Sequence, residues 1–384
     1  MIVGVPTETY PGERRVAIVP NALSLFEKLG VEVCIEAGAG SRAGFPDEDY
    51  AARGATTGLS RAEVFERADV VAQVRGFGAN PEEGRADLER FRSGQVLVST
   101  LDPLGNPQGA NELAKTGVVS FALELLPRIS RAQSMDVLSS MATVAGYHAT
   151  LLAATSTSTM WPLLMTAAGT ITPAKVLVVG AGVAGLQAIA TARRLGAVVD
   201  AYDVRPAARE QVESLGGNFI ELELDTGDSE DSGGYAQAMD ESFYERQREM
   251  MTQIVAAADA VITTAAVPGR AAPVLVTESM VRGMRPGSVL VDLAAETGGN
   301  CDATVAGETR DLDGVSVIGP TNVPSAVPAD ASNMYARNVH SFLANLIEDG
   351  NVSLDKDDPI VQETTLTRDG SVTNDRVKEL LAGD

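Results

Sequence analysis

The first part of the chain alternates short apolar runs with longer stretches of mixed polarity. Apolar strands that alternate with helices are typical of an α/β domain, in which helices cover both faces of a parallel sheet. The pattern predicts strands at residues 2–5, 31–35, 70–74, 95–99 and 118–121, and helices at 21–29, 45–54, 61–68 and 106–115.

The same alternation returns after residue 174. A helix with one apolar face at 330–346 is expected to return the chain to the first domain, because the tail beyond it has no core of its own. The sequence therefore predicts two α/β domains, residues 1–137 with about 330–384, and residues 138–329. Strands of the second domain are predicted at 176–179, 198–202, 218–222, 260–264, 288–293 and 315–319.

Residues 137–174 contain no Asp, Glu, Lys or Arg. A membrane-spanning helix needs about 20 mainly apolar residues, but this stretch is interrupted by hydroxyl side chains, Pro162 and Gly169. We expect instead a long helix, buried between the two domains and broken near Pro162. His148 lies in this helix, and we expect a buried, satisfied histidine rather than a catalytic one.

A glycine-rich turn follows the apolar run 176–179. Gly180 permits a tight turn, Gly182 lets the backbone approach a pyrophosphate, and Gly185 lets the following helix lie close to the strand. The next apolar run ends at Asp203, about 20 residues further on, where a carboxylate binds both ribose hydroxyls of an adenosine. Strand, glycines, helix, strand and acid together predict a dinucleotide site.

Asp203 favours NAD over NADP, because a carboxylate repels a 2′-phosphate. Arg205 lies two residues on and in principle binds that phosphate. Giving the acid more weight, we expect Arg205 to be either a neighbour of the pyrophosphate or a solvated surface charge.

Residues 225–240 interrupt the second domain with acids, Ser and Gly and show no periodicity. A loop of this length is unusual in a compact α/β unit and predicts a mobile binding loop, in which Tyr235 closes on the ligand. A disordered acidic insertion is the alternative.

The composition narrows the classes of function. The chain has 384 residues and a net charge of −22, which argues against nucleic acid as a partner. Two cysteines and two histidines are too few for a disulfide framework, and we expect no metal centre. The first residues carry no basic region or long apolar run, so we expect no signal peptide and a cytoplasmic location.

Several motifs resemble one known family. The sequence resembles the NAD(H)-binding component, or alpha subunit, of proton-translocating NAD(P) transhydrogenases, and more distantly alanine dehydrogenases. The segment PRISRAQSMD, residues 127–136, is the most specific of these motifs, because the general requirements of an α/β fold do not explain its sequence. The matching segments are VPTETYPGERRVAIVP from residue 5, PRISRAQSMDVLSS from 127, GAGVAGLQAIATARRLGA from 180, GGYAQAM from 233, TTAAVPGRAAPVL from 263 and DLAAETGGNC from 292.

The resemblance implies two Rossmann-like domains, linked by long helices, with NAD(H) bound in the cleft between them. It further implies direct hydride transfer to NADP(H) on a partner component, coupling to proton translocation by membrane-spanning subunits, a homodimer, and a location on the cytoplasmic side of the membrane.

The family's NAD(H)-binding residues map onto several segments of this chain. Arg128, Gln133, Asp136 and Ser139 surround the nicotinamide in the family, and the first three position it without acid–base chemistry. Ala266 occupies a position where the family usually has a larger aliphatic residue. From the residues alone, Ser134 simply caps the next helix. The remaining cofactor-binding residues that the resemblance implies are Ile129, Ser134, Met135, Gly180, Gly182, Val183, Ala184, Gly185, Asp203, Val204, Arg205, Gly234, Tyr235 and Gln247.

Two other functions are open. An alanine dehydrogenase needs a general acid or base and cations that hold the substrate carboxylate. Arg15 matches that family's arginine, but Arg75 replaces its lysine, Asp102 its histidine and Glu296 its aspartate. The acid–base histidine is therefore missing. The other alternative is a bare NAD-binding module.

Overall fold

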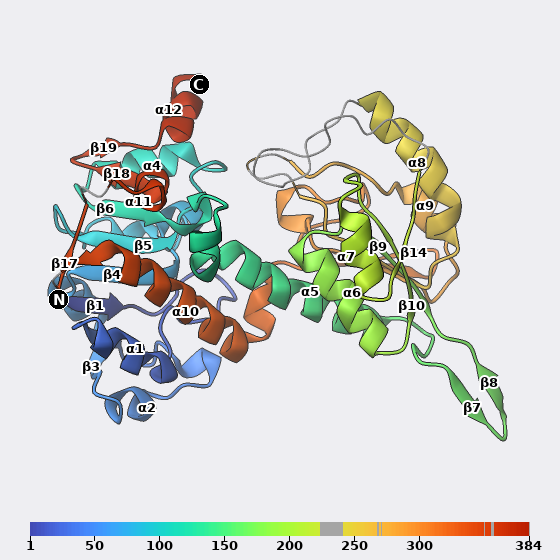
Figure 1. Cartoon of the computed structure of the whole chain (residues 1–384), viewed down its shortest axis with the longest axis horizontal. Helices are drawn as coiled ribbons and strands as arrows, with labels where there is room; N and C mark the ends of the chain where they lie inside the picture. The colour runs from blue at the N-terminus through green and yellow to red at the C-terminus, as the bar shows by residue number, and fades with distance from the viewer. Residues whose placement is uncertain (223–240, 267–268, 270, 349, 355–356, 384) are drawn as a thin grey trace. The chain divides into compact units, whose positions relative to one another are not determined.

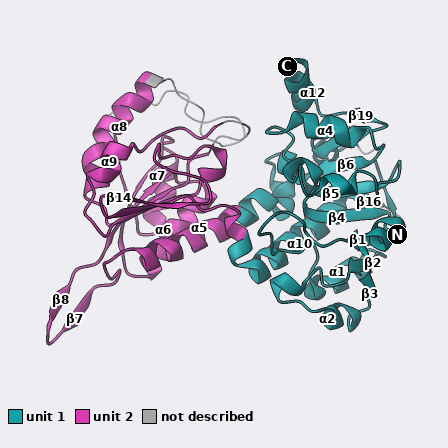
Figure 2. Ribbon diagram, turned by 180° about the vertical axis from the view of Figure 1, so that it is seen from behind, with its two compact units in different colours: residues 1–141, 325–384 teal, residues 142–324 magenta. Residues whose placement is uncertain are grey.

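The structure is a computed structural model and describes residues 1–384 except 223–240, 267–268, 270, 349, 355–356 and 384 (Figure 1). The chain divides into two compact units (Figure 2). Unit 1 contains residues 1–141 and 325–384, and unit 2 contains residues 142–324. These borders lie within a few residues of positions 137 and 330, where the sequence predicts the domain borders.

Unit 1 is built on a sheet with the strand order β19-β18-β6-β5-β4-β1-β2-β3. Strands β1 to β6 pair in parallel, as predicted, whereas β18 and β19 add antiparallel pairs at one edge. The tail therefore extends the sheet of the first unit. The strands are β1 (Ile2–Val5), β2 (Glu32–Glu36), β3 (Thr56–Leu59), β4 (Val70–Arg75), β5 (Val96–Thr100), β6 (Val119–Ala122), β18 (Thr365–Arg368) and β19 (Ser371–Val372).

Helices cover this sheet and fill its core. Helix α10 (Pro328–Leu346) contributes Tyr335 and Phe342, and the ring of Phe342 packs edge-on against Phe121 of β6, with centroids 5.4 Å apart. A 3-10 helix, η6 (Ser130–Met135), lies against α10. The other helices of the unit are α1 (Leu23–Lys28), α2 (Asp47–Ala51), α3 (Arg61–Arg67), α4 (Pro107–Ala114), α11 (Pro359–Thr364) and α12 (Asp375–Gly383).

Unit 2 has the strand order β11-β10-β9-β12-β13-β15-β14, and every pair except β14 with β15 is parallel. The strands that follow β9 in sequence are added on one side of it, and those that follow β12 are added on the other side, so the strand order reverses between β9 and β12. In such sheets, ligands bind at the carboxyl ends of the strands, where the order reverses. The strands are β9 (Lys175–Val179), β10 (Val198–Tyr202), β11 (Asn218–Phe219), β12 (Ala260–Thr263), β13 (Val289–Asp292), β14 (Thr309–Leu312) and β15 (Val315–Ile318).

Helices α6 (Val183–Arg194), α7 (Ala208–Ser214), α8 (Glu241–Ala256) and α9 (Glu278–Arg282) belong to unit 2. The fold class predicted from the pattern, two α/β domains on largely parallel sheets, is confirmed.

The uncharged stretch differs from the prediction. Helix α5 (Val137–Ser156) ends before Pro162, and a hairpin of β7 (Leu164–Thr166) and β8 (Gly169–Ile171) follows (Figure 1). Gly169 has φ +131°, a backbone conformation that favours glycine, which explains a turn where we expected helix. By length and composition alone α5 could cross a membrane. Its Ala149 and Ala153 are core residues of unit 2.

Candidate functional site

The glycine turn lies at the carboxyl end of β9, beside the point where the strand order reverses. Gly180 has φ +96°, and its N–H donates to Tyr202 O of β10 at 2.8 Å. Thr264, just after β12, donates from Oγ1 to Gly180 O at 3.0 Å. The turn is therefore tied to both neighbouring strands.

Helix α6 begins directly after Gly182, which is its N-cap residue. A Cβ added at Gly185 would lie 1.9 Å from Gly180 O, so this glycine is required for the helix to approach the turn. A Cβ at Gly182 would meet no atom within 4 Å. Val183 and Ala184 form the first turn, whose free amides and positive dipole end favour an anion. The arrangement suits a pyrophosphate.

Asp203 follows β10 and is 8% exposed. Its Oδ2 accepts the N–H of Ala181, in the glycine turn, at 2.7 Å. Arg205 donates its backbone N–H and Nε to Oδ1 at 2.8 and 2.9 Å, and Nη2 to Oδ2 at 3.0 Å. Arg205 is therefore not a solvated surface charge: it is half of a largely buried ion pair with the predicted ribose-binding acid, and Val204 connects the two. The place of Arg205 beside a pyrophosphate stays a prediction.

Two further predicted residues lie in unit 2. Gln247 of α8 is buried, at 2% exposure, and Ala266 is exposed in the segment that follows β12. Gly234 and Tyr235, with the whole of the predicted mobile loop 225–240, lie outside the described residues. Within the described residues, no group of three or more His, Cys, Asp or Glu side chains is placed to hold a metal ion.

The segment 128–139 belongs to unit 1. Asp136 caps α5, because its Oδ1 accepts the Ser139 N–H at 2.9 Å and its Oδ2 accepts Ser139 Oγ–H at 2.6 Å. The prediction that Ser134 is the cap is therefore wrong; Ser134 O instead accepts Nδ2 of Asn338 in α10 at 2.9 Å.

The other side chains of this segment differ in exposure. Arg128, Ile129 and Gln133 are exposed, whereas Met135 is buried. The polar side chains Arg128 and Gln133 are thus presented on a firmly anchored turn.

Comparison with known proteins identifies the family. Residues 4–145 match the family model described as "Alanine dehydrogenase/PNT, N-terminal domain", and residues 149–375 match "Alanine dehydrogenase/PNT, C-terminal domain". This chain belongs to the alanine dehydrogenase/PNT family. Both halves of the chain are thus accounted for by one family.

Within the family, the chain is more similar to transhydrogenases than to alanine dehydrogenases. It is 46% identical to an NAD(P) transhydrogenase subunit alpha polypeptide of Rhodospirillum rubrum, over 97% of this chain and 98% of that one. The solved structure of a transhydrogenase from Sinorhizobium meliloti matches with TM-score 0.84 and 42% identity, covering 98% of this chain and 100% of that one. An alanine dehydrogenase of Mycolicibacterium smegmatis is 29% identical over 98% of this chain and 96% of that one. The predicted resemblance is confirmed.

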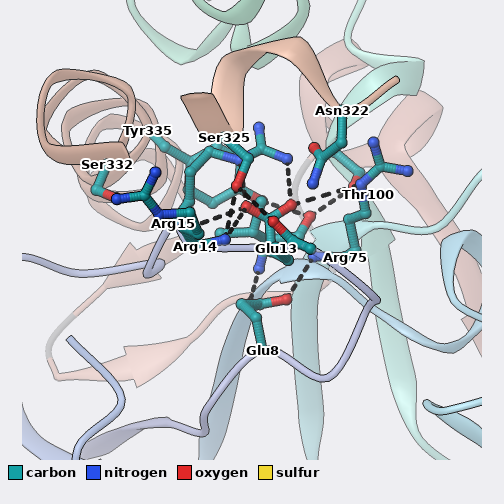
Figure 3. A network of polar contacts seen from close by, with 12 residues as sticks. Glu8, Glu13, Arg14, Arg15, Arg75, Thr100, Asn322, Ser325, Ser332 and Tyr335 are labelled. Atoms are coloured by element: carbon teal, nitrogen blue, oxygen red, sulfur yellow. Dashed lines mark hydrogen bonds and ion pairs between the residues drawn. The ribbon is translucent and has the colours of Figure 1, made fainter. Parts of the chain in front are cut away.

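Two of the four residues that match the alanine dehydrogenase substrate pocket, Arg15 and Arg75, lie in a largely buried network in unit 1 (Figure 3). The other two, Asp102 and Glu296, are exposed, and Glu296 belongs to unit 2. Arg15 donates from Nε and Nη2 to the two carboxylate oxygens of Glu13 at 2.8 and 2.6 Å. Nε of Arg75 lies 3.6 Å from Glu13 Oε2. Burial by itself raises the pKa of Glu13, but the hydrogen bonds and charge of Arg15 lower this pKa to about 2. Both cations are thus engaged by a carboxylate of the chain itself.

Two other carboxyl groups are buried at the carboxyl ends of β4 and β5. Glu8 accepts the N–H groups of Val74 and Arg75, and Glu124 Oε1 accepts those of Leu101 and Asp102. Burial, with the negative charge of Glu13, raises the pKa of Glu8 to about 7. Burial, with the charge of Asp102, raises the pKa of Glu124 to about 7. Neither residue was selected from the sequence, because a lone glutamate gives no sign of its burial.

Glu124→Gln should stabilise the chain at pH 8. The pKa of Glu124 is higher in the folded state than the ordinary 4.5, so its contribution to stability is present below pH 4.5 and lost as the pH rises through about 7. Glutamine keeps an oxygen for both N–H groups and replaces the buried Oε2, which has no hydrogen-bond partner. We expect the free energy of unfolding to rise by about 1–3 kcal/mol at pH 8, and thermal unfolding measures this change.

The gain should be absent at pH 4.5, where the wild-type carboxyl is protonated in the folded chain. Glu27→Gln, at an exposed position of α1, is the matched control and should change unfolding equally little at both pH values. A gain for Glu124→Gln that is the same at pH 4.5 and 8 would contradict this account.

Proposed function

We propose that this chain binds NAD(H) and transfers hydride directly between it and NADP(H) held by a partner subunit, coupled to proton translocation across a membrane. One observation carries the proposal: the Gly180–Gly185 turn, with Asp203 hydrogen-bonded to it, lies at the reversal of strand order in a homologue of transhydrogenase alpha subunits. Adenosine binds beside Asp203, the pyrophosphate at the start of α6, and the nicotinamide toward β12.

Direct hydride transfer requires geometry rather than a proton acceptor. The two rings must be held about 3–3.5 Å apart in a defined orientation. Arg128, Gln133 and Asp136, with Ser139, position the nicotinamide in this proposal and supply no acid or base.

The partners are transhydrogenase subunits that bind NADP(H) and span the membrane, and they hold this chain on its cytoplasmic side. We also propose a homodimer. The β7–β8 hairpin exposes 77% of Met165 and 41% of Ile171, and Leu163, directly before it, is 54% exposed. An exposed apolar patch of this kind is typical of an interaction site. In a chain of net charge −22, a surface free of charges is where two copies meet with least repulsion.

The test is reconstitution. Mixing this chain with NADP(H)-binding and membrane-spanning transhydrogenase subunits in vesicles should give NADH-dependent reduction of an NADP⁺ analogue and proton uptake, and the chain alone should give neither. Sedimentation of the chain should give a molecular mass twice that of one chain, which is 40.0 kDa. NADH formation from NAD⁺ and alanine without partner subunits would instead establish an amino-acid dehydrogenase. NADH binding without any transfer in the mixture would leave a bare binding module.

A further inference from the structure

Asn300 clamps the segment that follows β12. Its side chain is fully buried and makes three hydrogen bonds to main-chain atoms of that segment. Oδ1 accepts the N–H of Ala265 at 3.0 Å, and Nδ2 donates to Ala265 O at 2.8 Å and to Pro273 O at 2.9 Å. Both polar groups of Ala265 are therefore fixed by one side chain, 35 residues away in sequence.

Asn300 is itself held in place by a buried carboxylate. Asp292, the last residue of β13, is fully buried, and its Oδ2 accepts the N–H groups of Asn300 and Cys301 at 2.7 and 3.0 Å. Its Oδ1 accepts Thr263 Oγ1–H at 2.9 Å. Asp292 thus couples the ends of β12 and β13 to the clamp, and the side-chain amide of Asn300 has little freedom to reorient.

The clamped segment borders the proposed coenzyme site. Ala265 follows Thr264, whose hydroxyl is bonded to Gly180 O of the glycine turn, and precedes Ala266, a predicted coenzyme contact. In a doubly wound sheet, the two halves bind one mononucleotide each, with the adenosine half on β9 to β11 and the other half on β12 to β15. The segment after β12 therefore faces the nicotinamide half of NAD(H).

We infer that Asn300 is a positioning residue for the nicotinamide half of the coenzyme: it holds the main chain of Ala265 and Ala266 where that half binds. Asn300 does not touch the coenzyme in this scheme, since its oxygen and its amide protons are already used within the chain. The inference rests on the proposed NAD(H) site.

The geometry suggests a test that separates the two halves of the coenzyme. AMP binds only to the adenosine half, whereas NADH binds to both. Asn300→Ala removes the clamp but leaves the strands β9 and β10 and Asp203 untouched, so its effect should be confined to NADH.

The measurement is titration with NADH by fluorescence and with AMP by calorimetry, both far below the unfolding temperature. For Asn300→Ala we expect the Kd for NADH to rise at least tenfold and the Kd for AMP to stay within twofold of wild type. Asn300→Ser, which retains a small polar group and is the milder change, should show the same selective loss and guards against a misfolded alanine variant.

Two control variants match the change. Thr304→Ala removes a hydrogen bond to the same Asp292, at 2.8 Å, without touching the clamped segment. Asn374→Ala removes a buried asparagine of unit 1, whose Nδ2 donates to Glu363 O at 2.9 Å. Both should keep the wild-type ratio of NADH to AMP affinity.

Equal weakening of NADH and AMP, or an unchanged Kd for NADH with only a lower unfolding temperature, would overturn the inference and leave the proposed function standing. A wild-type chain that binds AMP and NADH equally weakly, in the millimolar range, would overturn the proposed function and the inference with it.

Discussion

Replacing Gly182 with alanine is expected to weaken NADH binding at least tenfold while leaving the unfolding temperature unchanged. Nothing within 4 Å would meet the added Cβ, and the backbone at Gly182 is extended, with φ −74° and ψ −170°, which any residue adopts. The chain itself therefore has no need of glycine there. The second glycine of such a turn allows the backbone to approach a pyrophosphate, and a methyl group would occupy that space.

Gly185→Ala is the matched variant with the opposite expectation. Its Cβ would lie 1.9 Å from Gly180 O and 3.1 Å from Thr264 Oγ1, so helix α6 must move away from the turn. Overlap of this kind in a packed interior costs about 1–3 kcal/mol or more, and the unfolding temperature should fall by several degrees.

Thermal unfolding without ligand and NADH titration of both variants distinguish the two roles. If Gly182→Ala binds NADH as tightly as wild type, no phosphate approaches this turn, and the central observation behind the proposed function is lost. If it unfolds as early as Gly185→Ala, the glycine serves the fold rather than a ligand.

The elements predicted well from the sequence are those whose signal is local. The apolar runs that became β9 and β12 are bounded by glycine or by polar residues, and strands buried on both faces must be continuously apolar. The predicted boundaries of these strands are within one residue of those observed. The glycine turn was predictable for the same reason, since Gly180 and Gly185 are required by local backbone geometry and close contacts.

The elements that the sequence did not reveal depend on their neighbours. The strands β3, with the sequence TTGL, and β14, with TRDL, are short and polar and lie at the edges of their sheets. An edge strand has one pairing partner and little buried surface, so its sequence carries no strong pattern. In the same way, the antiparallel pairing of β18 with β6 joins segments more than 200 residues apart, and no short-range pattern reports it.

The site shows the same division. Asp203 was selected because its distance from the glycines is characteristic, but the direction of the Arg205 side chain depends on how the chain leaves β10. The sequence motif around Asn300 predicts no role for this residue, because its partners are main-chain atoms of a remote segment. A polar residue shortly after a buried strand of such a sheet is the signal that would have selected it.

The ion pair between Asp203 and Arg205 changes the prediction for coenzyme choice. In the proposed site the carboxylate faces the adenosine ribose, and Arg205 partly neutralises it and holds it in place. Repulsion of a 2′-phosphate by Asp203 is therefore weaker than for an isolated carboxylate, and the guanidinium that could bind this phosphate is kept occupied. The preference for NADH over NADPH should depend on both residues together.

Asp203→Asn is expected to reduce the preference for NADH over NADPH at least tenfold. Asparagine keeps one oxygen for the Ala181 N–H, at 2.7 Å in the wild type, but removes the negative charge and releases the guanidinium of Arg205 toward the 2′-phosphate. Two unit charges 4 Å apart interact by about 1 kcal/mol in water and about 4 kcal/mol near a protein surface, enough for such a change. The measurement is the ratio of the two Kd values, from fluorescence titrations at fixed ionic strength.

Arg205→Ala should change the same ratio in the opposite direction, because it exposes the Asp203 carboxylate to the 2′-phosphate and removes the cation beside it. In the double variant, the gain in NADPH affinity seen for Asp203→Asn should disappear, since that gain depends on the released guanidinium; the interaction energy of this double-mutant cycle measures the dependence. If Asp203→Asn leaves the ratio at its wild-type value, the carboxylate does not face the ribose. If the double variant keeps the full gain, charge removal alone accounts for it and Arg205 has no part in the choice of coenzyme.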